Sequence, residues 1–394
     1  MIDVKKARAE TPGTENVLHF NNAGAALMPG VVVDALKDHI DLEAEIGGYE
    51  AAAQTIDAND HTYDAIAGLI NCKTTEVAFV ENATVGWSGA FYGLANTFKS
   101  GDRILTARAE YSSNYIAYLQ IAERTGIQID VIPDDETGAL SPSALGNMID
   151  DRVKLISITH VPTNGGLINP AAAVGKIANA AGVPYLLDAC QSVGQMPIDV
   201  AEIGCDMLSA TGRKYLRGPR GTGFLYASSQ IMEKFDPPVL DNHSAKWTGR
   251  NTYEIRSDAK RFENWENYTA GKIALGVAVD YAASWGLDNI YARNLDLAAL
   301  FRDRLSQIQG VTLRDLGTNP GAIVTFTVDE IKAPEITARM AKHKINITQS
   351  TLFSTRLDME KRHLNAVVRA SLHYYNTEQE IDLFIEKLTV EIAE

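Results

Sequence analysis

The sequence predicts an α/β fold with a large domain built on a mostly parallel sheet and a smaller C-terminal α+β domain. Short apolar runs alternate with amphipathic helical segments from about residue 76 to 230, as is typical of strands that helices cover on both faces. The pattern changes in about the last hundred residues, where alternating strand patterns appear between helices. A length of 394 residues is enough for two or three domains.

The strands of the large domain are expected at short apolar runs with polar or turn residues on either side. These runs are 76–80, 103–106, 128–132, 154–158, 185–187, 207–208 and 223–226. Helices are expected between them at 85–98, 114–124 and 171–181. Because ligands bind beyond the carboxyl ends of parallel strands, the residues that follow these runs are the first candidates for a site.

The second half of the chain is expected to begin with a long polar connection at 236–258. The elements expected after it are helices at 269–284 and 289–308, a strand at 322–328, a helix at 333–342, and strands at 345–347 and 367–374. The capping-box sequence Thr377–Glu380 then opens a final helix.

Composition and charge exclude several classes of protein. The 36 basic and 50 acidic residues give a net charge of −14, which repels phosphate backbones, so no nucleic-acid partner is expected. No apolar run reaches the roughly 18 residues that span a bilayer, and the N-terminus has no signal-peptide pattern. We therefore expect a cytoplasmic protein without a membrane partner. The three cysteines are too few for a disulfide framework, and the eight histidines show no metal-ligand spacing, so no metal site is predicted.

Two charged residues mark a candidate site in the large domain. Asp188 stands at the carboxyl end of the apolar run 185–187, and Lys214 follows in a later loop that precedes a glycine-rich turn. A carboxylate at the end of a buried strand needs a partner, because an unpaired buried charge is costly. Taken alone, the spacing of the two residues favours an ordinary ion pair.

The wider pattern resembles the class V aminotransferase family, the pyridoxal-phosphate (PLP) enzymes that include cysteine desulfurases. The resemblance extends from Phe20–Gly24 to Arg369–Thr377. Its most specific signals are the Asp-x-x-Gln motif at 188–191 and the Gly-x-Lys motif at 212–214, in this order and at this spacing.

The resemblance implies the fold type I architecture of PLP-dependent transferases, with a seven-stranded sheet in the large domain. It places the large PLP-binding domain at 18–260, a connecting helix at 261–290 and the small C-terminal domain at 291–394. The N-terminal segment 1–17 is expected to join the small domain.

The resemblance also gives each part of the PLP ring a partner. Lys214 matches the lysine that holds the PLP aldehyde as a Schiff base. Asp188 matches the carboxylate that keeps the pyridine nitrogen protonated, and Gln191 matches the residue that hydrogen-bonds the ring phenolate oxygen. Tyr111 stands where the family often has a histidine that stacks on the ring.

The PLP phosphate is matched to residues of two turns. Ala83 and Thr84 match the phosphate-binding turn before a helix, where Thr84 is expected to cap the helix N-terminus. Thr211 and Arg213 match the Ser and His that precede the lysine in desulfurases. Thr269 matches a residue that reaches the phosphate of the partner subunit, which implies a homodimer with shared active sites.

The substrate side of the site is matched to four residues. Arg369 matches the arginine that binds the substrate carboxylate, although a lone arginine in a strand is also consistent with a surface salt bridge. Thr163 stands where desulfurases have an asparagine, and the adjacent Asn164 is a possible substitute. Asn22, in the first motif of the resemblance, is also expected on the substrate side.

The position of the cysteines argues against a persulfide-forming desulfurase. Desulfurases have a nucleophilic cysteine on a loop shortly before the carboxylate-binding arginine, but the corresponding stretch, 348–363, has no cysteine. All three cysteines lie at or before Cys205. Cys190 neighbours Asp188 in the sequence, and it is expected to pack in the protein interior.

Three local sequences, 159–166, 262–266 and 373–376, look most like a branch that holds isopenicillin-N-epimerase-like proteins and the ergothioneine-pathway C–S lyase. The favoured hypothesis is a PLP-dependent C–S β-lyase that cleaves a cysteine-derived substrate to pyruvate, ammonia and a sulfur-bearing fragment. The alternatives are an amino-acid epimerase or racemase, a class V aminotransferase, and a regulatory or binding protein without activity. The presence of both Lys214 and Asp188 argues against the last of these.

Overall fold

The computed structural model describes residues 1–393 and contains a central sheet of seven strands. In chain order the strands are β2 (Val77–Val80), β3 (Arg103–Thr106), β4 (Gln128–Val131), β5 (Val153–Thr159), β6 (Tyr185–Asp188), β7 (Met207–Thr211) and β8 (Gly223–Ala227). Their order across the sheet is β2-β8-β7-β6-β5-β3-β4. All neighbours pair in parallel except β8, which runs antiparallel to β2 and β7. The predicted mostly parallel, seven-stranded sheet is confirmed.

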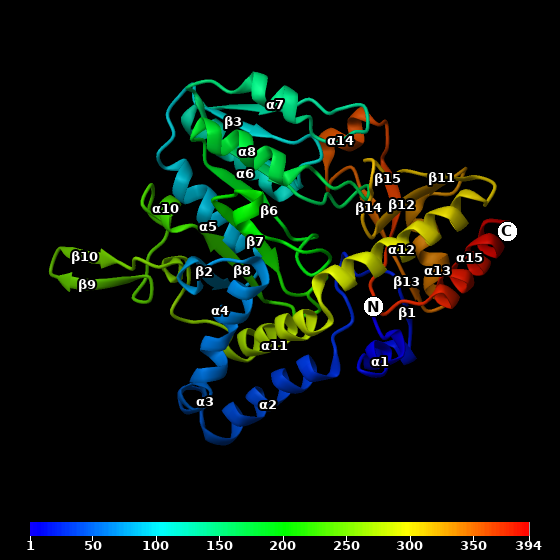
Figure 1. Cartoon of the computed structure of the whole chain (residues 1–394), viewed down its shortest axis with the longest axis horizontal. Helices are drawn as coiled ribbons and strands as arrows, with labels where there is room; N and C mark the ends of the chain where they lie inside the picture. Colours follow the sequence, from blue (N-terminus) through cyan, green and yellow to red (C-terminus); the bar gives the residue numbers. More distant parts are fainter. Residues whose placement is uncertain (394) are drawn as a thin grey trace.

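Helices cover both faces of the central sheet, as the apolar strands require (Figure 1). The helices on one face are α4 (Ile56–Ile70), α7 (Pro142–Met148), α8 (Ala171–Ala181), α9 (Val200–Ile203) and α11 (Thr269–Trp285). The helices on the other face are α5 (Ala83–Ala95), α6 (Ser112–Thr125) and α10 (Ser229–Met232).

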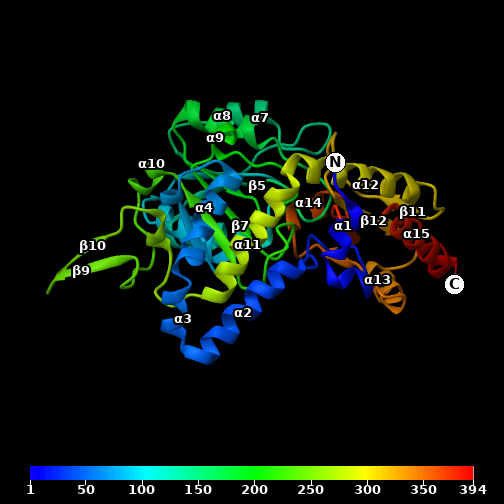
Figure 2. The same cartoon turned by 60° about the horizontal axis from the view of Figure 1, so that its bottom comes forward.

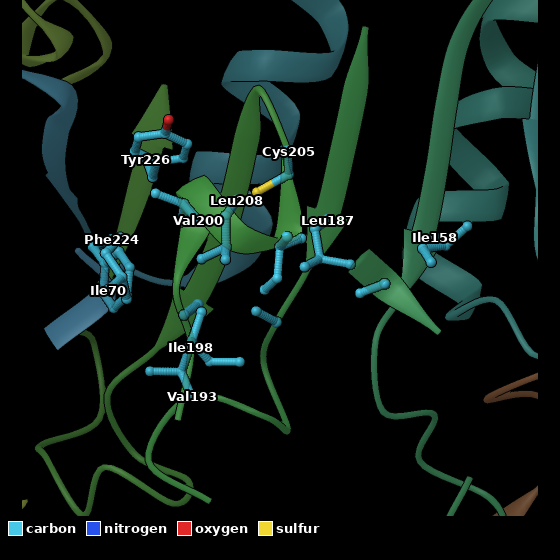
Figure 3. Close-up of a cluster of buried hydrophobic side chains, with 14 of the residues drawn as sticks. Ile70, Ile158, Leu187, Val193, Ile198, Val200, Cys205, Leu208, Phe224 and Tyr226 are labelled. Carbon is cyan, nitrogen blue, oxygen red and sulfur yellow. The ribbon is translucent and has the colours of Figure 1, made fainter. Parts of the chain in front are cut away.

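The side chains of neighbouring strand residues point to opposite faces of this sheet. Leu187 and Leu208 pack in the cluster of the first face, which Figure 3 shows. Leu186 and Met207, one residue earlier on the same strands, pack on the second face. Complete burial of such a side chain stabilises the fold by about 1.5–3 kcal/mol, so these two layers hold the strand ends in fixed positions.

The C-terminal part forms a second, smaller layer structure. Its antiparallel sheet has the order β11-β12-β15-β14, formed by β11 (Val311–Leu313), β12 (Ile323–Val328), β15 (Ala366–Ser371) and β14 (Thr348–Thr351). The helices that pack on it are α12 (Leu287–Ser306), α13 (Ala333–Lys342) and α15 (Glu378–Ala393). Phe301, Phe326 and Phe384 lie in the shared core. The predicted α+β domain is therefore confirmed.

The N-terminal segment lies beside this smaller sheet. Its elements are α1 (Val4–Ala9), a 3₁₀ turn (Pro12–Glu15) and β1 (Leu18–His19). Strand β1 pairs in parallel with β13 (Ile345–Asn346). The long helix α2 (Gly30–Ile46) and the shorter α3 (Gly48–Gln54), which the sequence patterns did not indicate, then lead the chain to the large sheet.

The expected long connection at 236–258 is wrong in one respect, because it contains a β-hairpin. Strands β9 (Ala245–Gly249) and β10 (Thr252–Ile255) form this antiparallel pair, which projects from the large domain away from the small one (Figures 1 and 2). Its side chains are mostly exposed, Trp247 among them. The hairpin therefore lacks the alternation between core and solvent that makes a strand visible in a sequence. Among residues 1–393, no helix combines the length and the apolar character needed to cross a bilayer.

Candidate active site

A pocket of about 150 Å³ opens where β5, β6 and β7 end and where α5 and α6 begin. The register of the sheet places Thr159, the last residue of β5, beside Asp188, the last residue of β6. The residues that line the pocket are Asn82, Ala83, Thr84, Trp87, Tyr111, Asn114, Thr159, Val161, Thr163, Asp188, Cys190, Gln191, Thr211, Arg213 and Lys214. The site thus lies at the carboxyl edge of the sheet, where the fold class predicts it.

Most of the site residues predicted from the sequence meet in this pocket. Those that line it are Ala83, Thr84, Tyr111, Thr163, Asp188, Gln191, Thr211, Arg213 and Lys214. Four others do not line it, namely Asn22, Asn164, Thr269 and Arg369. Residues from five separate stretches therefore converge on one cavity, as a ligand site requires.

Asp188 is buried, and donors hold both of its oxygens. Its Oδ2 accepts a hydrogen bond of 3.0 Å from Asn114 Nδ2, and its Oδ1 accepts one of 3.0 Å from the Cys190 N–H. Its partners are thus a side-chain amide and a backbone N–H rather than the Lys214 amine. The simple ion pair that spacing alone allowed is not what the structure forms.

Lys214 reaches the same cavity from the loop after β7. Burial lowers the pKa of its amine, and the nearby Arg213 lowers it further. Arg213 donates from its guanidinium to the Gly24 carbonyl oxygen, which keeps its side chain at the rim of the pocket. A lysine whose neutral form is favoured in this way is suited to act as a nucleophile or a base.

The start of α5 provides an anion site, although not in the form predicted. The helix begins at Ala83, and Asn82 is its N-cap, with Oδ1 accepting from the Val85 N–H at 3.1 Å. The expected capping role of Thr84 is wrong, because Thr84 lies inside the first turn. The first-turn N–H groups have no partner within a helix, and the helix dipole favours an anion in front of them.

Gly223, the first residue of β8, allows a close approach to this turn. A Cβ atom on Gly223 would lie 2.6 Å from the Ala210 carbonyl oxygen of β7, 3.0 Å from the Asn82 carbonyl carbon and 3.1 Å from the Ala83 nitrogen. Real Cβ contacts are rarely this short. The strand and the helix N-terminus therefore fit together only because position 223 has no side chain.

Two buried polar groups near the pocket have unused hydrogen-bonding capacity. Gln191 Nε2 donates to the Ala23 carbonyl oxygen at 3.1 Å, and its Oε1 has no partner among the described residues. Arg369 donates to the Thr163 hydroxyl and, at 3.4 Å, to Asn21 Oδ1, and its Nε has no partner in the described chain. Buried polar atoms are rarely left unpaired, so both groups point to a ligand.

Arg369 lies behind Thr163 and is buried on β15. Burial lowers the pKa of its guanidinium to about 10, so the group stays protonated at neutral pH. Its protein partners are neutral oxygens, without a carboxylate. The surface salt bridge considered for this arginine is therefore not formed.

Asn22, Asn164 and Thr269 have surroundings of their own. Asn22 donates to the Ser371 carbonyl oxygen at 2.7 Å and accepts from the Tyr375 hydroxyl. Asn164 donates to the Thr351 carbonyl oxygen at 3.4 Å. Thr269 is the first residue of α11 and is partly buried. The functional roles assigned to these three residues stay predictions.

Sequence reasoning missed several residues of the pocket wall, Trp87, Asn114 and Val161 among them. Asn114 is the third residue of α6, and its contact with Asp188 joins positions 74 residues apart. Thr159 had a usable signal, since it ends a strand directly next to the strand of Asp188. Trp87 and Val161 had none, because apolar residues in these positions also suit a core.

The stretch 348–363 lies against the pocket wall. It forms β14 and the short helix α14 (Arg356–Lys361). Ser350 donates from Oγ to the Thr163 carbonyl oxygen at 3.5 Å, and the Ser354 carbonyl oxygen accepts from the Ser112 N–H at 3.0 Å. Both contacts are to residues at or next to the cavity, so this stretch is placed to influence what enters it.

A comparison with protein families decides the family question. The class V aminotransferase model matches residues 18–384, which is nearly the whole chain. The chain belongs to the class V aminotransferase family. This confirms the resemblance stated from the sequence, and because the family is PLP-dependent, it also confirms PLP as the family's cofactor.

Among the relatives of this chain are proteins named probable cysteine desulfurase. One from Pyrococcus abyssi is 26% identical over 383 residues, covering 96% of this chain and 95% of the relative. One from Synechocystis is 28% identical over 386 residues, covering 95% of this chain and 91% of the relative.

Solved structures show the same architecture. The apo cysteine desulfurase from Thermococcus onnurineus has a TM-score of 0.92 and 25% identity, and the match covers 100% of this chain and 99% of that one. A cystine C–S lyase in complex with cysteine persulfide has a TM-score of 0.85 and 22% identity, covering 96% of this chain and 99% of that one. The predicted fold type I architecture is confirmed.

Proposed function

We propose that this chain is a PLP-dependent C–S β-lyase, which cleaves a cysteine-derived amino acid to pyruvate, ammonia and a sulfur-bearing fragment. One observation carries the proposal. Lys214 and Asp188 share a pocket with a buried arginine beside it, whereas the stretch 348–363 against its wall has no thiol. Such a site has the groups needed to activate an amino acid, but the stretch 348–363 provides no thiol to accept its sulfur.

The pocket fits the expected cofactor in three places. The N-terminus of α5, with Gly223 packed closely against it, suits a phosphate, and Thr211 and Arg213 stand nearby to add a hydroxyl and a positive charge. Asp188 offers a fixed carboxylate for a pyridinium nitrogen. The unpartnered Gln191 amide and the half-exposed Tyr111 ring are available to the remaining edge and face of the ring.

Each protein residue then has a distinct task in the reaction. PLP, when bound, supplies an electron sink that makes the Cα proton of an amino acid removable. Arg369 binds the substrate carboxylate with its unsatisfied guanidinium edge. Lys214 takes the Cα proton, since the lowered pKa of its amine favours the neutral form. The Cβ–S bond breaks with its electron pair on sulfur, and the sulfur fragment leaves without a covalent bond to the protein.

Cys190 is the cysteine of the pocket, and its environment argues against a sulfur-accepting role. Burial raises the pKa of the Cys190 thiol, and the neighbouring Asp188 raises it further. The thiolate is the nucleophilic form of cysteine, so this thiol is held in its unreactive form. This distinguishes the proposed lyase from the desulfurase reaction in the names of its relatives.

The proposal includes a homodimer in which Thr269 reaches the phosphate of the partner subunit. Thr269 does not line the pocket of its own chain. Trp265 and Tyr268, just before it, expose 54% and 38% of their surface. A dimer would cover these aromatic side chains. Analytical ultracentrifugation tests the assembly, and a monomer with full activity would contradict it.

The decisive assay uses PLP-loaded protein with S-substituted cysteines, their sulfoxides and alanine, and follows pyruvate and Cα deuterium exchange together. We expect pyruvate from the sulfur substrates and no turnover by Lys214→Ala. Borohydride reduction followed by peptide mapping should label the Lys214 peptide. Exchange without pyruvate would contradict the lyase, and chiral analysis of the product would then separate an epimerase from an aminotransferase.

A further inference from the structure

Glu110 is a buried carboxylate directly behind the pocket, on the segment between β3 and α6. Four donors converge on it. Oε1 accepts from the Thr159 hydroxyl at 2.5 Å, the Tyr111 N–H at 2.7 Å and Asn114 Nδ2 at 2.9 Å, and Oε2 accepts from the Thr106 hydroxyl at 3.0 Å. All four donors are neutral groups.

Asn114 connects this carboxylate to the floor of the pocket. Its Nδ2 donates to Glu110 Oε1 at 2.9 Å and to Asp188 Oδ2 at 3.0 Å. An amide nitrogen carries two hydrogens, so one group serves both carboxylates. The Asn114 amide is therefore held between the two carboxylates by one hydrogen bond to each.

The distribution of the donors indicates a role in the pocket rather than in the core. Tyr111, Asn114 and Thr159 line the pocket, and Thr106 is the exception. Burial raises the pKa of Glu110 to about 7, and the nearby Asp188 contributes to the rise. Burying a carboxylate here costs free energy, but its Oε1 accepts hydrogen bonds from three residues of the pocket.

We propose that Glu110 is a positioning residue that fixes Asp188 through Asn114 and holds Tyr111 and Thr159 in place through its own Oε1. It does not touch the reacting atoms. Its effect is to aim the Asp188 carboxylate at the cofactor ring and to set the position of the stacking residue. This inference rests on the proposed function, since it presumes that Asp188 and Tyr111 bind PLP.

The test compares four variants of the full chain by PLP titration, followed by the visible absorption and circular dichroism of the bound cofactor. Asn114→Ala removes the connection, and Glu110→Ala removes its anchor. Glu110→Gln retains an oxygen at the Oε1 position, while its NH₂ faces the Thr106 hydroxyl, which can rotate to accept. Thr106→Val is the matched control, because it removes the one donor that does not line the pocket.

We expect Asn114→Ala and Glu110→Ala to raise the Kd for PLP by about 10-fold or more, the scale of a lost hydrogen bond to a charged group, and to change the dichroism of the cofactor. Glu110→Gln should recover most of both properties. Thr106→Val should bind PLP within about 3-fold of the natural chain, since a neutral hydrogen bond away from the ligand contributes little to binding.

The outcomes separate this inference from the proposed function. If the natural chain binds no PLP, the proposed function fails. If the natural chain binds PLP and folded Asn114→Ala binds it equally well with the same spectrum, Glu110 does not position the site. If Glu110→Ala does not fold, Asn114→Ala and Glu110→Gln decide together, because Asn114 links the two carboxylates and glutamine retains the Oε1 acceptor. A Glu110→Gln variant as impaired as Glu110→Ala would also overturn the positioning role.

Discussion

Arg369 and Glu110 are buried ionisable residues whose protein partners are neutral groups. A buried charge without a counter-charge is costly, and proteins keep one mainly where a ligand or a reaction uses it. For Arg369 the missing partner is an anion, and we propose that the carboxylate of an amino acid supplies it. For Glu110 the charge is balanced by several donors that the pocket needs in fixed positions.

Replacement of Arg369 by alanine should raise KM for amino-acid substrates by about 10- to 100-fold, the loss of a charge-assisted hydrogen bond. The effect on kcat should be smaller, because Lys214 is unchanged. Steady-state kinetics check this with Arg152→Ala as control, since Arg152 pairs with Asp150 on the surface. An unchanged KM would exclude the carboxylate-binding role.

Glu110 should also make the free energy of unfolding depend on pH. Burial raises its pKa from 4.5 in the unfolded chain to about 7 in the folded one. Between these values the folded protein binds more protons than the unfolded one, so the free energy of unfolding falls as pH rises. The total fall is about 3 kcal/mol at most. Urea unfolding between pH 4.5 and 8 should show this slope in the natural chain and a weaker one in Glu110→Gln; equal slopes would contradict it.

At the scale of elements, the N-terminus of α5 shows what a sequence leaves open. Asn82 and Thr84 are both good N-cap residues, and local propensity does not choose between them. The choice is made by tertiary structure, since Gly223 packs against the turn at Asn82 and Ala83. Capping by Asn82 leaves Thr84 inside the first turn of α5, where it lines the pocket.

Gly223→Ala should weaken PLP binding by about 10-fold or more, because its Cβ would clash with the Ala210 carbonyl oxygen of β7 and with the turn at Asn82 and Ala83, and so displace the backbone around the proposed anion site. Gly68→Ala is a matched control within α4, where a Cβ meets no atom within 4 Å. It should stabilise the protein by about 0.5–1 kcal/mol, since alanine is the better helix former. PLP titration and thermal unfolding measure the two effects. Unchanged PLP affinity in Gly223→Ala would show that this contact does not shape the turn.

Across the whole molecule, the parts that could be predicted are those that a short stretch of sequence reveals by its own pattern. The central strands were predictable because each is an apolar run, whereas the roles of Asp188 and Lys214 were predicted from the resemblance of their motifs to a known family. The hairpin at 245–255 was not predictable, since it has no buried face. The role of Asn114 was not predictable either, because it depends on a contact with Asp188, which lies 74 residues later in the chain.

Arg217 joins three distant parts of the molecule three residues after Lys214. It is 1% exposed, and its guanidinium donates to Thr11 Oγ1, the Leu27 carbonyl oxygen and the Tyr374 hydroxyl at 2.5–2.8 Å. Its backbone has a φ of 60°, an unfavourable value for a residue with a side chain. These contacts must therefore outweigh that strain, and they fix the loop of Lys214 to both the N-terminal segment and the C-terminal part.

Arg217→Ala should lower the free energy of unfolding by about 3–5 kcal/mol, because it leaves a cavity and several buried polar groups without a partner. Arg220→Ala on the same loop is the control, since Arg220 is exposed and its loss should change stability by at most about 0.5 kcal/mol. In Arg217→Ala the N-terminal segment should also be cleaved faster by proteases, since its anchor at Thr11 and Leu27 is lost. Denaturant unfolding and limited proteolysis measure both effects. If Arg217→Ala and Arg220→Ala have the same free energy of unfolding, and the N-terminal segment is cleaved no faster in Arg217→Ala, then apolar packing rather than this one side chain holds the three parts together.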